Sequence, residues 1–218
     1  MKKYKTILFD LDGTVSNTKE GVTKCVQYAL GKMGIQVDDL EDLHHFVGPP
    51  MVTEYMRSYG MDKETALETL GYYRERYNPI GIYECHIYDG IKDILVWLNE
   101  NGYNVGLATS KPEPMALTVL DYLNIREYFN PEITCGADLN GPVLTKEDVL
   151  NKVFDNSNVS KEETVLIGDT IYDVEGCKKV NLDCIGVTYG MGEKEDLVKN
   201  GVITTIDHPM DLAKLLQQ

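Results

Sequence analysis

The sequence predicts an α/β protein in which a parallel sheet is covered by helices on both faces, with a helical segment inserted near its N-terminal end. Short runs of apolar and β-branched residues alternate with helical stretches from about residue 88 onward. Strict alternation of this kind favours parallel strands joined by crossover helices. One strand-like run, "TILF" at residues 6–9, precedes a long helical block, so the block interrupts the α/β unit.

The helical block is expected to span residues 15–87. Its first stretch, "KEGVTKCVQYALGKMG", has apolar residues every three or four positions, namely Val22, Cys25, Val26, Ala29, Leu30 and Met33. "MVTEYMRSYG" and "KETALETLGYYRERY" are also helical in character, and Pro79 and Gly81 end the pattern. We predict an all-helical cap domain at 15–87 and an α/β core at 1–14 and 88–218. The alternative is that these helices pack on the core without a separate role.

The elements expected after residue 88 alternate along the chain. Helices are expected in "GIKDILVWLNENG", "PMALTVLDYLNI", "TKEDVLNKVFDN" and "IYDVEGCKKV". Strands are expected in "YNVGLATS", "EITCG", "TVLIGD" and "DCIGVTYG", and "GVITTI" with the tail from Pro209 closes the series. Gly102 follows the first of these helices and is a typical helix stop.

The composition limits the partners and the compartment. The 218 residues carry a formal net charge of −14 without a cluster of Lys or Arg, whereas nucleic-acid binding needs a basic stripe. We therefore expect no nucleic acid and no membrane partner, and the apolar runs are shorter than the ~20 residues of a membrane span. The five cysteines are odd in number and form no C-x-x-C pair, which predicts reduced thiols in a cytoplasmic protein and argues against zinc.

Carboxylates follow two of the predicted strands. Asp10 comes directly after "TILF" with Asp12 two residues later, and Asp169 ends "VLIGD" with Asp173 four residues on. The carboxyl ends of parallel strands meet at one edge of a sheet, so we expect these side chains to converge. Two unit charges ~4 Å apart repel by ~4 kcal/mol at an effective dielectric of about 20. Convergence therefore predicts a cation, and this oxygen-rich set suits Mg²⁺.

The remaining polar residues at this edge favour a phosphate ligand. Lys146 near a helix start, together with Mg²⁺, would form a positive pocket in a negative protein. Asp10 and Asp12 lean the same way while the strand geometry lasts. One carboxylate can then attack phosphorus and form an acyl phosphate, while the other exchanges protons with the leaving oxygen and with water. Gly13 lets the backbone come close to the ligand.

The motifs "DLDGT", "TSK", a downstream Lys and "GDTIYD" resemble, in this order, those of the haloacid dehalogenase superfamily of phosphatases. The chain most resembles the phosphoglycolate phosphatase-like branch, which has a helical cap inserted after the first motif. The resemblance implies a Rossmann-like core and a Mg²⁺-dependent phosphatase that acts through an aspartyl phosphate. Its substrate would be a small phosphorylated metabolite such as phosphoglycolate, a nucleoside monophosphate or a sugar phosphate. A phosphomutase of the β-phosphoglucomutase type and a pyrophosphatase are the alternatives.

The resemblance also implies a role for each residue of the motifs. Asp10 would be the nucleophile and a Mg²⁺ ligand, Asp12 the general acid/base whose main-chain carbonyl binds the metal, and Asp169 a further metal ligand supported by Asp173. Thr109 and the Ser110 amide would hold phosphate oxygens, and Lys146 would neutralise the nucleophile and the phosphate. Lys111, in "TSKPEP", is a rival for the role of Lys146.

Two further features of the sequence lie outside these motifs. Asn17 stands where the family commonly has an acid, which affects cap hinging or a substrate contact rather than the phosphoryl chemistry. His44 and His45 are adjacent, and adjacent side chains diverge on a helix or a strand, so we expect no metal there. A monomer and a homodimer both remain open.

Overall fold

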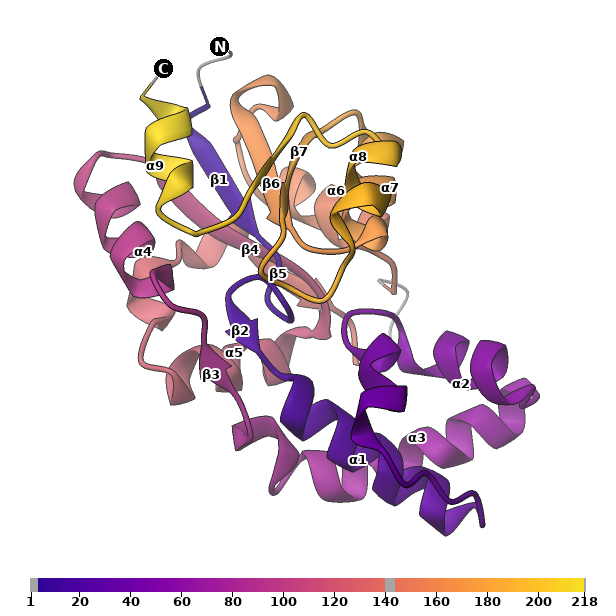
Figure 1. Ribbon diagram of the computed structural model, residues 1–218. Coiled ribbons are helices and arrows are strands. Elements are labelled where there is room, and N and C mark those ends of the chain that lie inside the picture. The colour runs from indigo at the N-terminus through magenta and orange to yellow at the C-terminus, as the bar shows by residue number, and fades with distance from the viewer. Residues whose placement is uncertain (1–3, 140–143, 218) are drawn as a thin grey trace.

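The computed structural model describes residues 4–139 and 144–217, so the parts of the expected core at 1–3, 140–143 and 218 lie outside the described residues. Six parallel strands form one sheet in the order β5-β4-β1-β6-β7-β8 (Figure 1). Their bounds are β1 Thr6–Phe9, β4 Asn104–Pro112, β5 Thr134–Ala137, β6 Thr164–Gly168, β7 Asp183–Val187 and β8 Thr204–Ile206. The predicted parallel α/β sheet is confirmed.

The strand β1 lies in the middle of the sheet and is buried on both faces. Ile7 and Phe9 belong to one apolar cluster, while Leu8 belongs to the other, because successive side chains of a strand point to opposite faces. This double burial explains why "TILF" reads as a continuous apolar run.

Helices cover both faces of the sheet. The cluster of Ile7 and Phe9 includes buried residues of α4 (Ile91–Glu100), α5 (Glu113–Tyr122) and α9 (Asp211–Leu216). The cluster of Leu8 includes buried residues of α6 (Lys146–Asn156), α7 (Ile171–Val180) and α8 (Lys194–Lys199). The short α8 is an element that the sequence pattern did not predict. Among the described residues, no helix is both long and apolar enough to span a bilayer.

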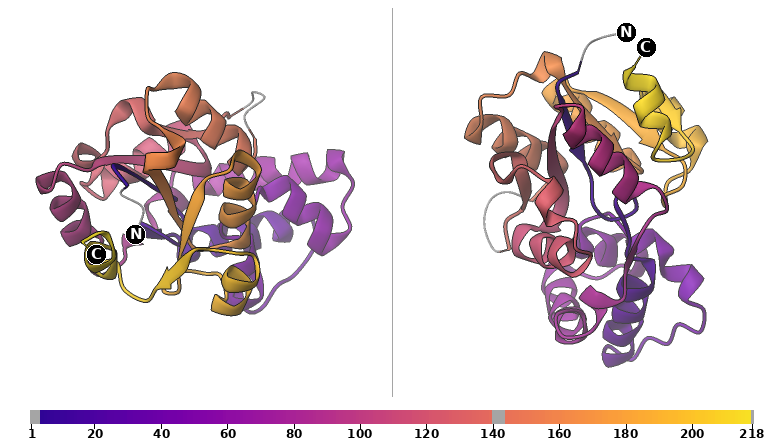
Figure 2. Two further views of the ribbon diagram at one scale, coloured as in Figure 1. Left: turned by 90° about the horizontal axis from the view of Figure 1, so that it is seen from above. Right: turned by 90° about the vertical axis from the view of Figure 1, so that its left-hand side faces the viewer.

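The helical block lies at one end of the molecule, beyond the carboxyl ends of the strands (Figures 1 and 2). It contains α1 (Lys19–Lys32), α2 (Met51–Tyr59), α3 (Lys63–Tyr77) and the 3₁₀ helices η1 (Leu40–Phe46) and η2 (Gly81–Tyr83). α3 packs against both α1 and α2, and the buried side chains of the block join the α4/α5/α9 cluster. The block therefore lies over the edge of the sheet at which the aspartates are expected to converge.

A small antiparallel pair joins the two connections between the block and the sheet. β2 (Ser16–Asn17) pairs with β3 (His86–Ile87), with Ser16 opposite Ile87 and Asn17 opposite His86. The pair lies at the expected boundaries of the cap, and it was not predicted because two-residue strands carry no periodicity. The entry and exit of the block are thereby held side by side.

Two helical glycines are expected to respond in opposite ways to alanine. Gly71 lies in the exposed middle of α3, and a Cβ there meets nothing within 4 Å. Gly71→Ala should raise the free energy of unfolding by about 0.5–1 kcal/mol, because alanine loses less backbone entropy. A Cβ on Gly21 of α1 would overlap the carbonyl oxygen of Gly81. Gly21→Ala should therefore lower the free energy of unfolding. Urea unfolding of both variants tests this packing, and a stabilising Gly21→Ala would contradict it.

Candidate active site

The site begins where β1 and its neighbour β6 end. Phe9 and Ile167 are opposite each other in the parallel register, and the Asp10 amide donates to the Ile167 carbonyl at 2.9 Å. Asp10 therefore leaves β1 next to the end of β6, where Asp169 follows. Two segments 159 residues apart along the chain are brought together by strand pairing alone.

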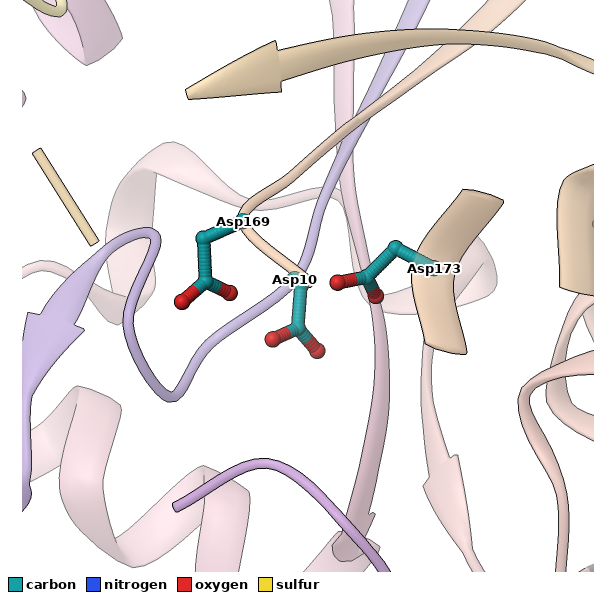
Figure 3. A group of neighbouring side chains, drawn as sticks. All are labelled: Asp10, Asp169 and Asp173. Atoms are coloured by element: carbon teal, nitrogen blue, oxygen red, sulfur yellow. The ribbon is translucent and has the colours of Figure 1, made fainter. Parts of the chain in front are cut away.

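Three carboxylates converge at this edge (Figure 3). Asp10, Asp169 and Asp173 each offer an oxygen within 4.8 Å of the others, and all three residues are buried. Burial raises the pKa of Asp10 to about 7, where the charge of Lys146 opposes the effect and that of Asp173 adds to it. Burial, with the charges of Asp173 and Asp10, also holds the pKa of Asp169 well above its usual range. Such a cluster could hold a metal ion that prefers oxygen ligands.

Lys146, the first residue of α6, supplies positive charge to this cluster. Its Nζ lies 2.6 Å from Asp10 Oδ1 and 2.8 Å from Asp173 Oδ1, and donates to the Ala108 carbonyl at 2.7 Å. Burial lowers the pKa of Lys146, but the carboxylates of Asp10 and Asp173 outweigh burial and raise it. The lysine therefore remains a buried cation, and Gly176 leaves the room that its side chain fills.

Asp173 has both of its oxygens engaged. Oδ1 pairs with Lys146, and Oδ2 accepts from the Thr170 amide at 3.0 Å and from the Thr170 hydroxyl at 2.9 Å. Thr170 and Asp173 form the capping box at the start of α7. The side chain thus stabilises a helix start and holds Lys146 toward Asp10 at the same time.

Asp169 is held by two hydrogen-bond donors that the sequence pattern did not predict. The Thr14 hydroxyl donates to Oδ1 at 3.2 Å, and the Met191 amide donates to Oδ2 at 2.8 Å. Gly13 has a φ of +91°, and a Cβ there would overlap the Asp169 carboxylate, so this turn requires glycine. The contact of the Met191 amide with Asp169 had one signal in the sequence, which is the pair of glycines that flank Met191 in "GMG" at 190–192.

Asp12 faces a second buried lysine instead of the carboxylate cluster. Lys111 Nζ lies 2.9 Å from Oδ1 and 2.8 Å from Oδ2 of Asp12. The Thr109 hydroxyl accepts from the Lys111 amide at 3.2 Å and is buried, whereas Ser110 is half-buried. The two lysines that the sequence offered as rivals therefore both reach carboxylates, Lys146 at Asp10 and Lys111 at Asp12.

Asn17 and the two histidines make their hydrogen-bond contacts outside the carboxylate cluster. Asn17 Oδ1 accepts from the Lys19 amide at 3.1 Å at the start of α1. His44 Nδ1 lies 2.6 Å from the Glu41 carbonyl oxygen, and His45 Nε2 lies 3.2 Å from the Ser58 hydroxyl. Both histidines line a pocket of 230 Å³ between the helical block and the loops after β6 and β7.

The described residues combine a parallel α/β sheet, paired aspartates after its central strand, a buried lysine and a third aspartate after the neighbouring strand. In such a site a carboxylate could act as a nucleophile. Residues 7–187 match the model of the family described as haloacid dehalogenase-like hydrolase. The chain belongs to this family, as its motifs predicted.

Three proteins that are similar to this chain carry different names. The crystal structure of a predicted phosphatase from Clostridium acetobutylicum has a TM-score of 0.94 and 40% identity over 99% of both chains. A 5'-nucleotidase from Pseudomonas aeruginosa is 37% identical over 89% of this chain and 87% of its own length. The tyrosine-protein kinase PtkA from Mycobacterium tuberculosis is 32% identical over 96% of this chain and 70% of its own length. All three names refer to chemistry at a phosphoryl group.

Removing the Lys146 cation is expected to leave two buried carboxylates without their partner. Lys146→Met should lower the free energy of unfolding by about 3–5 kcal/mol, because a buried ion pair that loses one member leaves an uncompensated charge. Lys152→Met on the same helix is the matched control, since Lys152 is partly exposed and pairs with Glu113; it should cost less than about 1 kcal/mol. Urea unfolding measures both, and equal losses would show that Lys146 does not compensate the cluster.

Proposed function

We propose that this phosphatase hydrolyses a small phosphomonoester through an aspartyl phosphate on Asp10, with Mg²⁺ as cofactor. The observation that carries the proposal is the Asp10 carboxylate at the end of the central strand, buried, 2.6 Å from Lys146 and beside Asp169. Phosphoglycolate, a nucleoside monophosphate and a sugar phosphate are the candidate substrates. The similarity to a 5'-nucleotidase favours the nucleoside monophosphate.

The donor set supports Mg²⁺. We assign Asp10 and Asp169 as carboxylate ligands and Asp12 as a ligand through its main-chain carbonyl, and Asp173, whose oxygens hold Lys146 and Thr170, as their support. Burial and the charges of neighbouring carboxylates raise the pKa values of Asp10 and Asp169, so a bound cation would stabilise their ionised forms. A bound Mg²⁺ would offset the charge of the phosphate and orient it.

The residues of the chain divide the reaction between them. An oxygen of Asp10 attacks phosphorus while the bond to the leaving oxygen breaks, and Asp12 gives that oxygen a proton. In the second step Asp12 takes a proton from the water that attacks the phosphorus of the aspartyl phosphate, which releases phosphate and frees Asp10. Lys146, the Thr109 hydroxyl and the Ser110 amide would hold the phosphate oxygens.

The helical block at 15–87 is proposed to act as a cap that hinges at the β2–β3 pair. Its position over the carboxyl ends of the strands supports this role (Figure 1). Closure would exclude bulk water during the reaction, and opening would release the product. We further propose that the enzyme works in the cytoplasm as a monomer or homodimer, with its five free cysteines reduced.

Asp10→Asn is expected to abolish turnover while the protein stays folded. The amide is a far weaker nucleophile than the carboxylate, so the loss should exceed about 10³-fold. Phosphate release from a panel of phosphomonoesters and pyrophosphate, with circular dichroism as the folding control, measures this. Isomerisation of sugar phosphates is assayed in parallel, since a phosphomutase would show it. Near wild-type phosphate release by this variant would refute the nucleophile assignment.

Mg²⁺ is expected to raise the thermal midpoint of the wild-type protein and EDTA to reverse the shift. Binding to the folded state stabilises it by about 2.7 kcal/mol at a hundredfold excess over Kd. Asp169→Asn should lose the shift because it removes a ligand. Asp121→Asn, at an exposed ion pair with Arg126, should retain it. A full Mg²⁺ shift in the Asp169 variant would place the metal elsewhere.

A further inference from the structure

Lys111 and Asp12 form a buried ion pair that the proposed phosphate chemistry does not by itself require. The side chains are only 6% and 10% exposed, and Nζ contacts both carboxylate oxygens at 2.8 and 2.9 Å. The pair links the loop after β1 to the end of β4, 99 residues further along the chain. A cation on both oxygens fixes the direction in which this carboxylate points.

The helical block completes the surroundings of this cation. Tyr77, the last residue of α3, is 2% exposed, and its ring centroid lies 5.1 Å from Lys111 Nζ. A cation over an aromatic face is stabilised more strongly in a desolvated site than at an exposed one. Tyr77 in turn stacks on Tyr73 of the same helix, with centroids 5.0 Å apart. Lys111 therefore lies between the sheet and the block.

The contacts of the two buried lysines do not overlap. Lys146 contacts Asp10, Asp173 and the Ala108 carbonyl, whereas Lys111 contacts Asp12 and the Tyr77 ring. A lysine that served chiefly to bind phosphate would compensate the nucleophile, as Lys146 does. Lys111 instead compensates the residue assigned to proton transfer.

We infer that Lys111 is the positioning residue of Asp12 and that Tyr77 couples this positioning to the helical block. The inference rests on the proposed function, because Asp12 has this role only if the enzyme transfers a phosphoryl group to Asp10. Proton transfer depends on the donor lying within hydrogen-bond reach of the leaving oxygen. When Asp12 carries the proton that it donates, one of its oxygens holds that proton and the other keeps the contact with Lys111. The Lys111 ammonium and the Tyr77 ring thus set the orientation of this carboxyl group in both of its protonation states.

The dependence of kcat/KM on the leaving group shows whether Lys111 positions the acid Asp12 or binds the phosphate. An alkyl phosphomonoester needs its leaving oxygen protonated, whereas p-nitrophenyl phosphate releases a stable anion. Lys111→Met should lower kcat/KM roughly 10²-fold for the alkyl ester and less than about threefold for p-nitrophenyl phosphate. Lys152→Met is the matched control and should change neither. Equal losses on both substrates, or weaker inhibition by inorganic phosphate, would make Lys111 a phosphate ligand and overturn the inference.

A double-mutant cycle with Asp12 tests the same point even where a single variant is less stable. If Lys111 acts through Asp12, adding Lys111→Met to Asp12→Asn should cause no further loss of kcat/KM for the alkyl ester. The double variant also removes both buried charges, so neither is left unpaired. Losses that multiply would show that Lys111 acts independently of Asp12.

The contribution of the helical block is tested at Tyr77. Tyr77→Leu removes the aromatic face and should lower kcat/KM for the alkyl ester about tenfold while sparing p-nitrophenyl phosphate. Tyr77→Phe keeps the ring and removes only the hydroxyl, which also interacts with Lys111, so its loss should be smaller than that of Tyr77→Leu. Thermal midpoints are measured for both variants. A loss of kcat/KM that is equal on the two substrates and parallels a lower thermal midpoint would contradict the coupling. A wild-type protein that releases no phosphate from either substrate would instead refute the proposed function itself.

Discussion

The site depends on the compensation of like charges that the fold buries at one edge of a sheet. Asp10, Asp169 and Asp173 lie within a few ångströms of one another and are shielded from water. Burial alone would drive each toward its neutral form. The Lys146 ammonium offsets part of this cost, and a divalent cation would offset more. Because the whole chain carries a formal net charge of −14, holding a phosphate here requires such local positive charge.

Strand pairing delivers the charged groups without help from long loops. Asp10 and Asp169 follow neighbouring strands in register, so the backbone hydrogen bonds between these buried strands set their positions. Lys146 and Asp173 each lie in the first turn of a helix. Capping contacts orient these first turns, so a rigid scaffold holds groups that must be aligned for chemistry.

The helical block contributes to the site through two kinds of contact. The β2–β3 pair keeps its entry and exit together, and the proposed cap movement would hinge there. Tyr77 covers Lys111, and Lys111 holds Asp12. The enzyme can thus link the position of a large segment to the orientation of one carboxylate, because each step in this chain of contacts is buried and directional.

The parallel α/β fold, the inserted helical block, the family and the aspartates that follow the strands could be predicted from the sequence, because these features depend on periodicity and on motifs that are local in the chain. The β2–β3 pair, the Thr14 and Met191 contacts of Asp169 and the pairing of Lys111 with Asp12 could be seen only in the folded chain. The partners in these contacts are mostly tens of residues apart or more, and such pairings are set by packing. For the lysines in particular, local sequence around "TSK" and "LTK" is nearly alike, and only the path of each side chain through the core separates their roles.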